Sequence, residues 1–512
     1  MLVPEMLRHS AHVRPGWEAV AEGGRTLTYA QLEERAQRLA NALRGGLGLE
    51  AGERFGLLST NRIEFPELYF GAAAARLACV PVNYRLAAPE VAEILDDAEA
   101  RLLVADPALG ELVARVTGDA GFDGRLLWLG DPYERLLADA SPGRRDEEAD
   151  DREAVLQMYT SGTTGTPKGV VLSHRNVVAN SWHLLAEDSV VASDRYLSTG
   201  PLCHLGAGSR IFLLAHVGAT HLIHPRFDAE RAAREMAEGT ANSALIVPAM
   251  VRQLLDAVDA AGTSLRGKVR LITYGMAPMP RDILTEALER LGCDFQQGYG
   301  LTEGGPNLTI LPPEDHRPDA SGEWSQRLTS VGRETIGVRV RVVDADDRDV
   351  PPGEIGEVIA RGPNIMEGYW HRPEETEAAL GGGWLRTGDL AMVDDTGYVY
   401  LVDRSKDMLV SGGFNVYPRE IERQLEQHPA VAEVAVVAEP HERWGEVPVA
   451  FVVPSSTVDG DELDAELARF CDERLARFKN PKRWVFVDEL PRNSIGKVSK
   501  PELRARLEEA KA

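Results

Sequence analysis

A ten-residue loop rich in hydroxyl groups and glycine carries the clearest chemical signal in the sequence. It spans Thr160–Gly169, reads TSGTTGTPKG, and follows the strand-like segment 154–159. Glycines let the backbone approach a ligand closely, hydroxyl and N–H groups donate hydrogen bonds, and Lys168 adds positive charge, so the loop is suited to binding phosphate. It is not a Walker loop, in which Gly-Lys-Ser/Thr leads into a helix, because Pro167 precedes the lysine and Gly169 follows it.

Six further motifs follow this loop in chain order. They are Pro201-Leu202-Cys203-His204, Tyr274-Gly275-Met276-Ala277-Pro278, Tyr299-Gly300-Leu301-Thr302-Glu303, Arg386-Thr387-Gly388-Asp389, Asp403-Arg404-Ser405-Lys406-Asp407 and Pro491-Arg492-Asn493-Ser494-Ile495-Gly496-Lys497. Tyr299 has a flat aromatic face on which a ring could stack, Glu303 offers the hard carboxylate oxygens that divalent cations such as Mg²⁺ prefer, and Asp389 can accept two hydrogen bonds at once. Taken singly, Glu303 would be read as a helix-start residue, Asp389 as a turn residue and Lys497 as a solvated cation.

Together, the seven motifs resemble the signatures of the adenylate-forming superfamily, which includes acyl-CoA synthetases, luciferases and peptide-synthetase adenylation domains. The resemblance extends over nearly the whole chain, and the run 405–422 looks like that of acyl- and aryl-CoA synthetases. It implies an ATP- and Mg²⁺-dependent acid–thiol ligase that forms an acyl-adenylate and transfers the acyl group to coenzyme A. Only fifteen residues follow Lys497, which favours coenzyme A over a fused carrier domain.

The resemblance also implies a role for individual residues. The catalytic set is Lys497, Glu303 and Thr302, with Glu303 as the Mg²⁺ ligand. The ATP- and AMP-binding set is Thr160, Ser161, Gly162, Thr163, Thr164, Gly165, Lys168, Gly275, Met276, Ala277, Pro278, Tyr299, Gly300, Thr302, Asp389 and Arg404. Within this set, Tyr299 would stack on adenine and Asp389 would accept both ribose hydroxyls. Lys406 is the hinge, and Ser411, Gly412 and Gly413 belong to the coenzyme A tunnel. A mobile lysine suits the chemistry, because carboxylate attack on phosphorus brings two anions together and a point cation lowers their repulsion.

The acid is predicted from the segments that line the acyl pocket in relatives. The predicted pocket residues are Cys203, His204, Val247, Tyr274, Gly275, Met276, Gly298 and Leu301. These segments are mostly apolar and contain no Asp for an amino acid's ammonium, which favours a fatty, medium- to long-chain monocarboxylic acid. An aryl-CoA ligase, or an acyl-AMP ligase that loads a carrier protein, are the alternatives. His204 is read equally as a gate to the channel and as a hydrogen-bonded core histidine.

Two positions depart from the pattern common among relatives. Cys203 stands where many have Phe, and Met276 stands where many have a second glycine. The first change enlarges the site and the second narrows it. We hypothesise that Met276 limits chain length, so that medium-chain or compact aryl acids fit better than long-chain acids.

The elements that must position these residues follow an α/β pattern. Thr28 and Gln31 have capping-box spacing before a helix, and apolar runs such as 55–58 and 79–82 alternate with helical patterns. From about residue 337 the pattern is β-rich. After Arg404 a compact α/β unit follows, with strands expected over 434–438 and 447–453 and a helix over 461–478. We predict a large N-terminal domain (1–404) of layered sheets and helices plus a β-rich subdomain, and a small mobile α/β domain (405–512).

Composition narrows the functional class further. The 512 residues include 56 Lys and Arg against 80 Asp and Glu, a net charge of −24, and such a surface repels nucleic acid and anionic lipid. The four cysteines are widely spaced and no run of about 18 apolar residues is present. We expect a cytoplasmic enzyme of small-molecule substrates, without nucleic acid or stable membrane insertion; a homodimer is left open.

Overall fold

The computed structural model describes residues 1–145, 148–160, 167–187, 189–277, 279–318, 321–411, 414–441, 444–455, 463–493 and 496–509. The chain separates into two compact units. The first comprises Met1–Val340 and Ala360–Arg386, and the second Arg341–Ile359 and Thr387–Ala512. The predicted boundary between domains 1–404 and 405–512, with its hinge at Lys406, is not tested by this division and stays a prediction.

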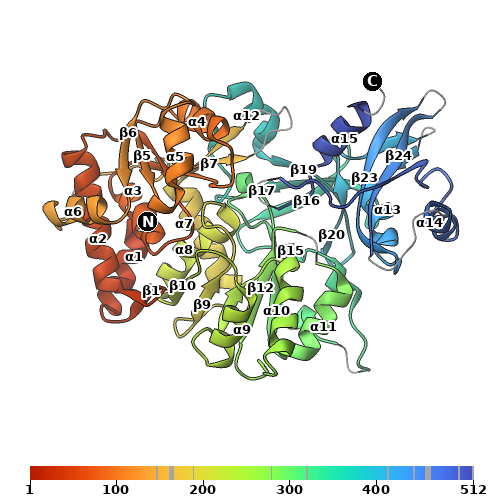
Figure 1. The fold of residues 1–512 in the computed structure, drawn as a ribbon, viewed down its shortest axis with the longest axis horizontal. Helices are drawn as coiled ribbons and strands as arrows, with labels where there is room; N and C mark the ends of the chain where they lie inside the picture. Colours follow the sequence, from red (N-terminus) through yellow and green to blue (C-terminus); the bar gives the residue numbers. More distant parts are fainter. Residues whose placement is uncertain are drawn as a thin grey trace. The chain divides into compact units, whose positions relative to one another are not determined.

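The first unit contains a mixed sheet of nine described strands in the order β15-β14-β13-β12-β11-β9-β10-β1-β2. Their bounds are β1 Glu18–Glu22, β2 Arg25–Thr28, β9 Arg195–Ser198, β10 Thr220–Ile223, β11 Ser243–Leu245, β12 Leu271–Gly275, β13 Asp294–Tyr299, β14 Thr309–Leu311 and β15 Arg333–Glu334. β13, β12, β11, β9 and β10 run parallel. Figure 1 shows α9 (Ala229–Ala237), α10 (Pro248–Ala260) and α11 (Arg281–Leu291) side by side, and they pack on one face of this sheet.

A second sheet of the same unit has the described order β18-β8-β7-β4-β3-β5-β6. Its strands are β3 Arg54–Leu58, β4 Ala78–Val82, β5 Leu102–Ala105, β6 Arg125–Trp128, β7 Ala154–Thr160, β8 Lys168–Ser173 and β18 Gly368–Tyr369. Alternate residues face opposite ways, as the strand period requires. Leu102 and Val104 join the central core, whereas Leu103 and Ala105 pack against α4 (Ala88–Asp97) and α5 (Gly110–Thr117).

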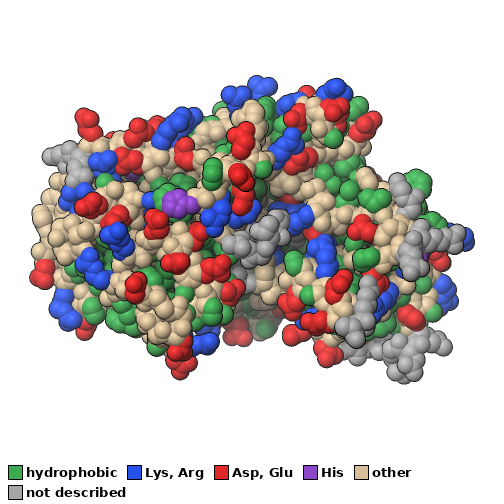
Figure 2. Space-filling model, turned by 90° about the horizontal axis from the view of Figure 1, so that it is seen from above, with side chains coloured by type: hydrophobic (Ala, Val, Ile, Leu, Met, Phe, Trp, Pro, Cys, Tyr) green, Lys and Arg blue, Asp and Glu red, His purple; other side chains and the backbone are tan. Residues whose placement is uncertain are grey.

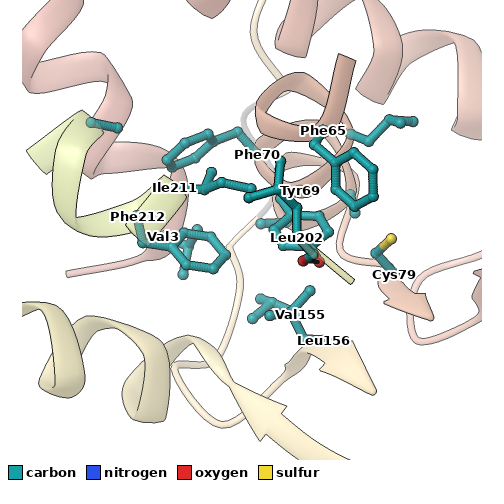
Figure 3. Close-up of a cluster of buried hydrophobic side chains, with 14 of the residues drawn as sticks. Val3, Phe65, Tyr69, Phe70, Cys79, Val155, Leu156, Leu202, Ile211 and Phe212 are labelled. Atoms are coloured by element: carbon teal, nitrogen blue, oxygen red, sulfur yellow. Dashed lines mark hydrogen bonds between the residues drawn. The ribbon is translucent and has the colours of Figure 1, made fainter. Parts of the chain in front are cut away.

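The main core lies between these two sheets. The helices that pack into it include α1 Val3–Val13, α2 Tyr29–Asn41, α3 Glu64–Ala74, α7 His174–Glu187 and α8 Leu205–Val217. Figure 3 shows aromatic rings from α3 and α8 in contact, and Tyr69 stacks on Phe212 with ring centroids 5.7 Å apart. The Tyr69 hydroxyl donates to the Leu202 carbonyl at 2.9 Å, which satisfies a polar group that would otherwise be costly to bury.

Shorter elements complete the first unit. They are α6 Asp131–Asp139, α12 Pro373–Leu380, the π-helical turn η1 Ala42–Gly46 and the 3₁₀ turns η2 Pro107–Leu109, η3 Thr302–Gly304, η4 Pro313–His316, η5 Gln326–Thr329 and η6 Gly381–Gly383.

The second unit is built on two smaller sheets. One contains β16 Arg339–Val343, β17 Gly356–Arg361, β19 Leu385–Val393 and β20 Val399–Arg404. The first two residues of β16 and of β19 and the last two of β17 fall in unit one. The other contains β21 Leu409–Ser411, β22 Phe414–Val416, β23 Val431–His441, β24 Gly445–Pro454 and β25 Arg483–Phe486. Helices α13 (Pro418–Leu425) and α14 (Leu463–Asp472) cover one face of this sheet and α15 (Lys500–Glu509) covers the other (Figure 1).

The α/β prediction is confirmed, and so is the helix start at Thr28. The Thr28 hydroxyl accepts from the Gln31 N–H at 3.3 Å, and the Gln31 side chain accepts from the Thr28 N–H at 2.9 Å. The expected helix over 461–478 is too long, because α14 ends at Asp472. The Asn480 side chain donates to the Asp472 carboxylate there, and this bond ties the helix end to the returning chain.

The surface agrees with the acidic composition. On the face in Figure 2, acidic side chains are spread among basic ones, with no continuous basic stripe. Among the described helices, none is long and apolar enough to cross a membrane.

Candidate active site

The predicted nucleotide and acyl segments of the first unit follow the carboxyl ends of neighbouring parallel strands. Gly200 lies just beyond β9, Val247 beyond β11, Met276 beyond β12 and Gly300 beyond β13. In open α/β sheets this edge is where ligands bind. The topology therefore brings four segments together that are separated by up to 100 residues in the sequence.

The phosphate-loop lysine is held by strand pairing. β7 and β8 form an antiparallel pair in which Thr160 lies opposite Lys168, so the ends of the loop are fixed by the sheet. Next along, β18 pairs with β8 and places Tyr369 opposite Val170. The Lys168 ammonium lies 5.3 Å from the centre of the Tyr369 ring and forms an ion pair with Glu375 of α12.

Glu303 lies in a short 3₁₀ turn that the surrounding backbone fixes. The Met366 N–H donates to the Glu303 carbonyl at 2.9 Å, and the buried Asn364 amide donates to the Gly304 carbonyl at 2.5 Å. The carboxylate itself accepts a hydrogen bond from the Tyr369 hydroxyl on Oε1, also at 2.9 Å. Among the described residues, none donates a hydrogen bond to Oε2, so this oxygen suits a hard cation such as Mg²⁺.

Two glycines at the strand ends are required by close backbone contacts. A Cβ on Gly300 would lie 1.9 Å from the Pro306 carbonyl oxygen, and one on Gly275 would lie 2.5 Å from the Gly298 carbonyl oxygen. Tyr299 is buried, with 9 % of its surface exposed. Its predicted contact with adenine stays a prediction.

Met276 has an unusual backbone for a residue with a side chain. Its φ is +66°, in the left-handed region that costs an L-residue other than Gly about 1–2 kcal/mol. Its side chain covers two glycines: a Cβ on Gly206 would lie 2.5 Å from the Met276 sulfur, and one on Gly200 would lie 3.7 Å from its terminal methyl. Met276 therefore fills the space between the end of β9 and the first turn of α8.

The other predicted pocket residues do not all lie beside Met276. Tyr274 points into the core under α10 and α11, where its hydroxyl bonds the His316 ring nitrogen Nε2 at 2.9 Å. Its ring therefore belongs to that core rather than to the surface beside Met276, which packs against the core between the sheets. Cys203 is buried, and burial raises the pKa of its thiol to about 12, so it is not a nucleophile at neutral pH. His204, Val247 and Leu301 are half-buried.

The second unit places the predicted ribose and lysine residues on one sheet and the turns beside it. Asp389 of β19 lies opposite Arg404 of β20 in the antiparallel register, and the Arg404 Nε contacts the Asp389 carboxylate at 2.7 Å. The carboxylate is nearly buried, whereas the guanidinium is half exposed. A cross-strand partner of this kind fixes the carboxylate's direction.

Lys497 follows a tight turn in this unit. Gly496 has φ +84°, and the Asn493 side chain accepts from the Lys497 N–H at 2.9 Å. The residue is exposed, but loss of hydration around the ammonium lowers its pKa; the charge of Arg404 lowers it further and that of Asp389 opposes this. Lys497 is therefore electrostatically coupled to Asp389 and Arg404.

Lys406 lies in the exposed turn between β20 and β21, closed by the bond from the Asp407 N–H to the Arg404 carbonyl at 3.0 Å. Partial burial and the charge of Arg404 lower the pKa of Lys406. Ser411 is buried at the end of β21. Several predicted contacts lie outside the described residues: Ser161, Gly162, Thr163, Thr164, Gly165, Pro278, Gly412 and Gly413.

Two family models cover most of the chain. The AMP-binding enzyme model matches residues 7–370, and the AMP-binding enzyme C-terminal domain matches residues 420–497. The chain belongs to the AMP-binding enzyme family. It is an acid–thiol ligase of the acyl-CoA synthetase branch of the adenylate-forming superfamily, so that prediction from the motifs is confirmed.

Proteins similar to this chain are named as ligases of different acids. The chain is 38% identical over 500 residues to a feruloyl-CoA synthase of Amycolatopsis sp, covering 97% of each. It is 38% identical over 505 residues to the fatty acid–[acyl-carrier-protein] ligase ScoC of Streptomyces coeruleorubidus, covering 97% of this chain and 95% of ScoC. The O-succinylbenzoate coenzyme A synthetase of Bacillus subtilis, solved with ATP and a magnesium ion, superposes with a TM-score of 0.84 at 28% identity, over 98% and 99% of the two chains. ATP binding is thus supported for this AMP-binding enzyme, and Mg²⁺ is indicated.

Three residues around the nucleotide segments were missed by the sequence interpretation. Tyr369, Glu375 and Asn364 contact Glu303, Lys168 and Gly304, yet they lie 60 to 207 positions away from those partners. Tyr369 lies in the run Glu367-Gly368-Tyr369-Trp370, whose aromatic pair beside a glycine was the available signal. No local pattern could have assigned the partner.

Proposed function

We propose that this AMP-binding enzyme activates a monocarboxylic acid with a short apolar body, a medium-chain or compact aryl acid. The acid and ATP give acyl-AMP and pyrophosphate, and acyl-AMP and coenzyme A then give acyl-CoA and AMP. Met276 carries the size limit, because its side chain occupies the space over Gly206 and Gly200 that a glycine at position 276 would leave open. The feruloyl-CoA relative supports an aryl acid within this class.

Each charged residue of the site has its own role in adenylation. Lys168 holds the outer phosphates of ATP, Asp389 accepts the ribose hydroxyls, and Arg404 keeps that carboxylate in place. Glu303, with Thr302 next to it in the sequence, would hold magnesium, which would supply positive charge against the phosphates. Lys497 stabilises the charge where carboxylate and α-phosphate meet. The acid is already ionised at neutral pH, so the chain needs no general base.

The first half-reaction, adenylation, requires Lys497 at the reacting groups. The second requires the coenzyme A thiol to reach the acyl-adenylate. We place the hinge at Lys406, whose turn between β20 and β21 is exposed and closed by few hydrogen bonds. A hinge needs only a few residues to absorb the change in φ and ψ.

The size limit predicts the effect of Met276→Gly on acid preference. Removing the side chain opens the space over Gly206, so acids one or more methylenes longer should gain relative to short ones. A methylene in an apolar pocket is worth about 1–3 kcal/mol, so we expect a gain of about 10-fold or more in relative kcat/KM. The measurement is kcat/KM over saturated C4–C18 acids, benzoate and cinnamate.

Two matched variants separate volume from backbone strain. Met276→Leu keeps the bulk and the unfavourable φ, so its profile should resemble wild type. Gly206→Ala adds a methyl group against the Met276 sulfur, so its profile should shift toward shorter acids. An unchanged profile in Met276→Gly would rule out the size limit.

A carrier protein as acyl acceptor is the second candidate, favoured by the similarity to ScoC. AMP formation measured with and without coenzyme A distinguishes the two. Coenzyme A should raise steady-state turnover and yield acyl-CoA. If the rate of pyrophosphate release does not depend on coenzyme A, and the acyl group is transferred to a purified carrier protein, the carrier protein is the acyl acceptor.

The lowered pKa of Lys497 predicts an early alkaline loss of adenylation. The ammonium must be charged to act, so activity is full below its pKa and falls as pH rises through it. Since loss of hydration around the ammonium and the charge of Arg404 lower this pKa while Asp389 raises it, the fall should begin below the range of an ordinary lysine, near 10.5. Pyrophosphate release against pH in wild type and Lys497→Arg tests this: arginine stays charged, so the alkaline limb should disappear.

A further inference from the structure

Tyr369 lies between the two charged residues of the first unit's nucleotide segments. Its hydroxyl contacts Glu303 and its ring contacts Lys168, which lie 135 positions apart in the sequence. The position is fixed on both sides: β18 pairs with β8, and the Tyr369 N–H donates to the Thr376 hydroxyl of α12 at 2.9 Å. One aromatic side chain therefore joins two groups that come from separate elements.

The contact with Glu303 sets the direction of the carboxylate. The Tyr369 O–H donates to Oε1 at 2.9 Å, a charge-assisted bond that occupies one oxygen and directs the other away from the ring. A donor that orients a metal-binding carboxylate in this way usually changes metal affinity when it is removed.

The contact with Lys168 is made by the ring rather than by the hydroxyl. The ammonium lies 5.3 Å from the ring centre and forms an ion pair with Glu375. The lysine is largely buried, at 17 % side-chain exposure, so its reach is restricted. The face of an aromatic ring attracts a cation, more strongly where solvent is excluded than where it reaches the contact.

We propose that Tyr369 is a positioning residue for nucleotide binding, whose hydroxyl orients the Glu303 carboxylate for the metal and whose ring orients Lys168 for the phosphates. The inference rests on the proposed roles of Glu303 and Lys168. The hydroxyl and the ring have separate proposed functions, and substitution can remove either the hydroxyl alone or the hydroxyl together with the ring.

Tyr369→Phe removes the hydroxyl and keeps the ring. We expect the Kd for ATP in excess Mg²⁺, measured by calorimetry without acid or coenzyme A, to rise about 10-fold. In EDTA, the Kd for metal-free ATP should stay as in wild type, because the ring still supports Lys168. In turnover, KM for Mg·ATP should rise more than kcat falls.

Tyr369→Leu also removes the ring, and it should weaken binding of ATP both with Mg²⁺ and in EDTA. Tyr400→Phe is the matched control, because it removes a hydroxyl that donates to Asp394 at 3.1 Å in the second unit, and it should leave both affinities unchanged. A Tyr369→Phe variant with wild-type affinity in Mg²⁺, or with equal weakening in both conditions, overturns the inference.

The proposed role of Glu303 is checked in the same assay. If Glu303→Gln weakens Mg·ATP binding and Tyr369→Phe does not, the positioning inference fails while the proposed function stands. If Glu303→Gln leaves Mg·ATP binding unchanged, the metal role fails and the inference falls with it. Thermal unfolding near the wild-type midpoint for Tyr369→Phe shows that any loss of affinity is not loss of fold.

Discussion

Replacing Lys497 by alanine should reduce acyl-adenylate formation by about two to three orders of magnitude, while acyl transfer from synthetic acyl-AMP to coenzyme A is largely retained. Removing one group that stabilises developing charge in a dry site typically costs this much. Only the first half-reaction brings carboxylate and phosphate together, so only that half should lose rate. Pyrophosphate release measures the first half, and acyl-CoA formation from acyl-AMP measures the second.

The position of Lys497 supports this asymmetry. The turn at Gly496 and the Asn493 side chain hold its backbone, and the side chain is influenced by Asp389 and Arg404, the proposed ribose pair. Lys482→Ala is the matched control: this exposed lysine of the same unit donates to the Arg477 carbonyl and should leave both halves unchanged. Equal loss of both half-reactions in Lys497→Ala would contradict the two-conformation proposal.

The secondary structure around the site could be predicted because its signals are local. The strand that precedes the phosphate loop was expected over 154–159, and β7 spans Ala154–Thr160. The capping box at Thr28 involves residues three positions apart. The end of α14 could not be found in this way, because it depends on Asn480, eight positions beyond the last helical residue.

The tertiary contacts of the site depend on strand order, which local patterns do not contain. The motifs predicted Glu303 and Lys168 as site residues, yet Tyr369, which contacts both, belongs to a two-residue strand that pairs with β8. Met276 was singled out from the motif, but its left-handed backbone and its contact with Gly206 needed coordinates. Tyr274 was assigned to the pocket with Met276, and the turn between them sends its ring to the opposite core.

Glu303→Gln should lower overall turnover by about 100-fold and raise the Mg²⁺ concentration needed for half-maximal rate. The amide keeps the shape of the side chain and removes the charge that holds a divalent cation beside the phosphates. Turnover against free Mg²⁺ at saturating ATP measures both effects. Glu314→Gln, an exposed glutamate in the 3₁₀ turn η4, is the control and should behave as wild type.

A double-mutant cycle connects this variant to Tyr369. The hydroxyl acts through the Glu303 carboxylate, so in the Glu303→Gln background the Tyr369→Phe change should add little to the loss of Mg·ATP affinity. Residues that share one hydrogen bond are expected to be non-additive by about 0.5–3 kcal/mol. Additive losses would mean that the hydroxyl contributes independently of the carboxylate, and the 2.9 Å contact would then be a packing feature rather than part of nucleotide binding.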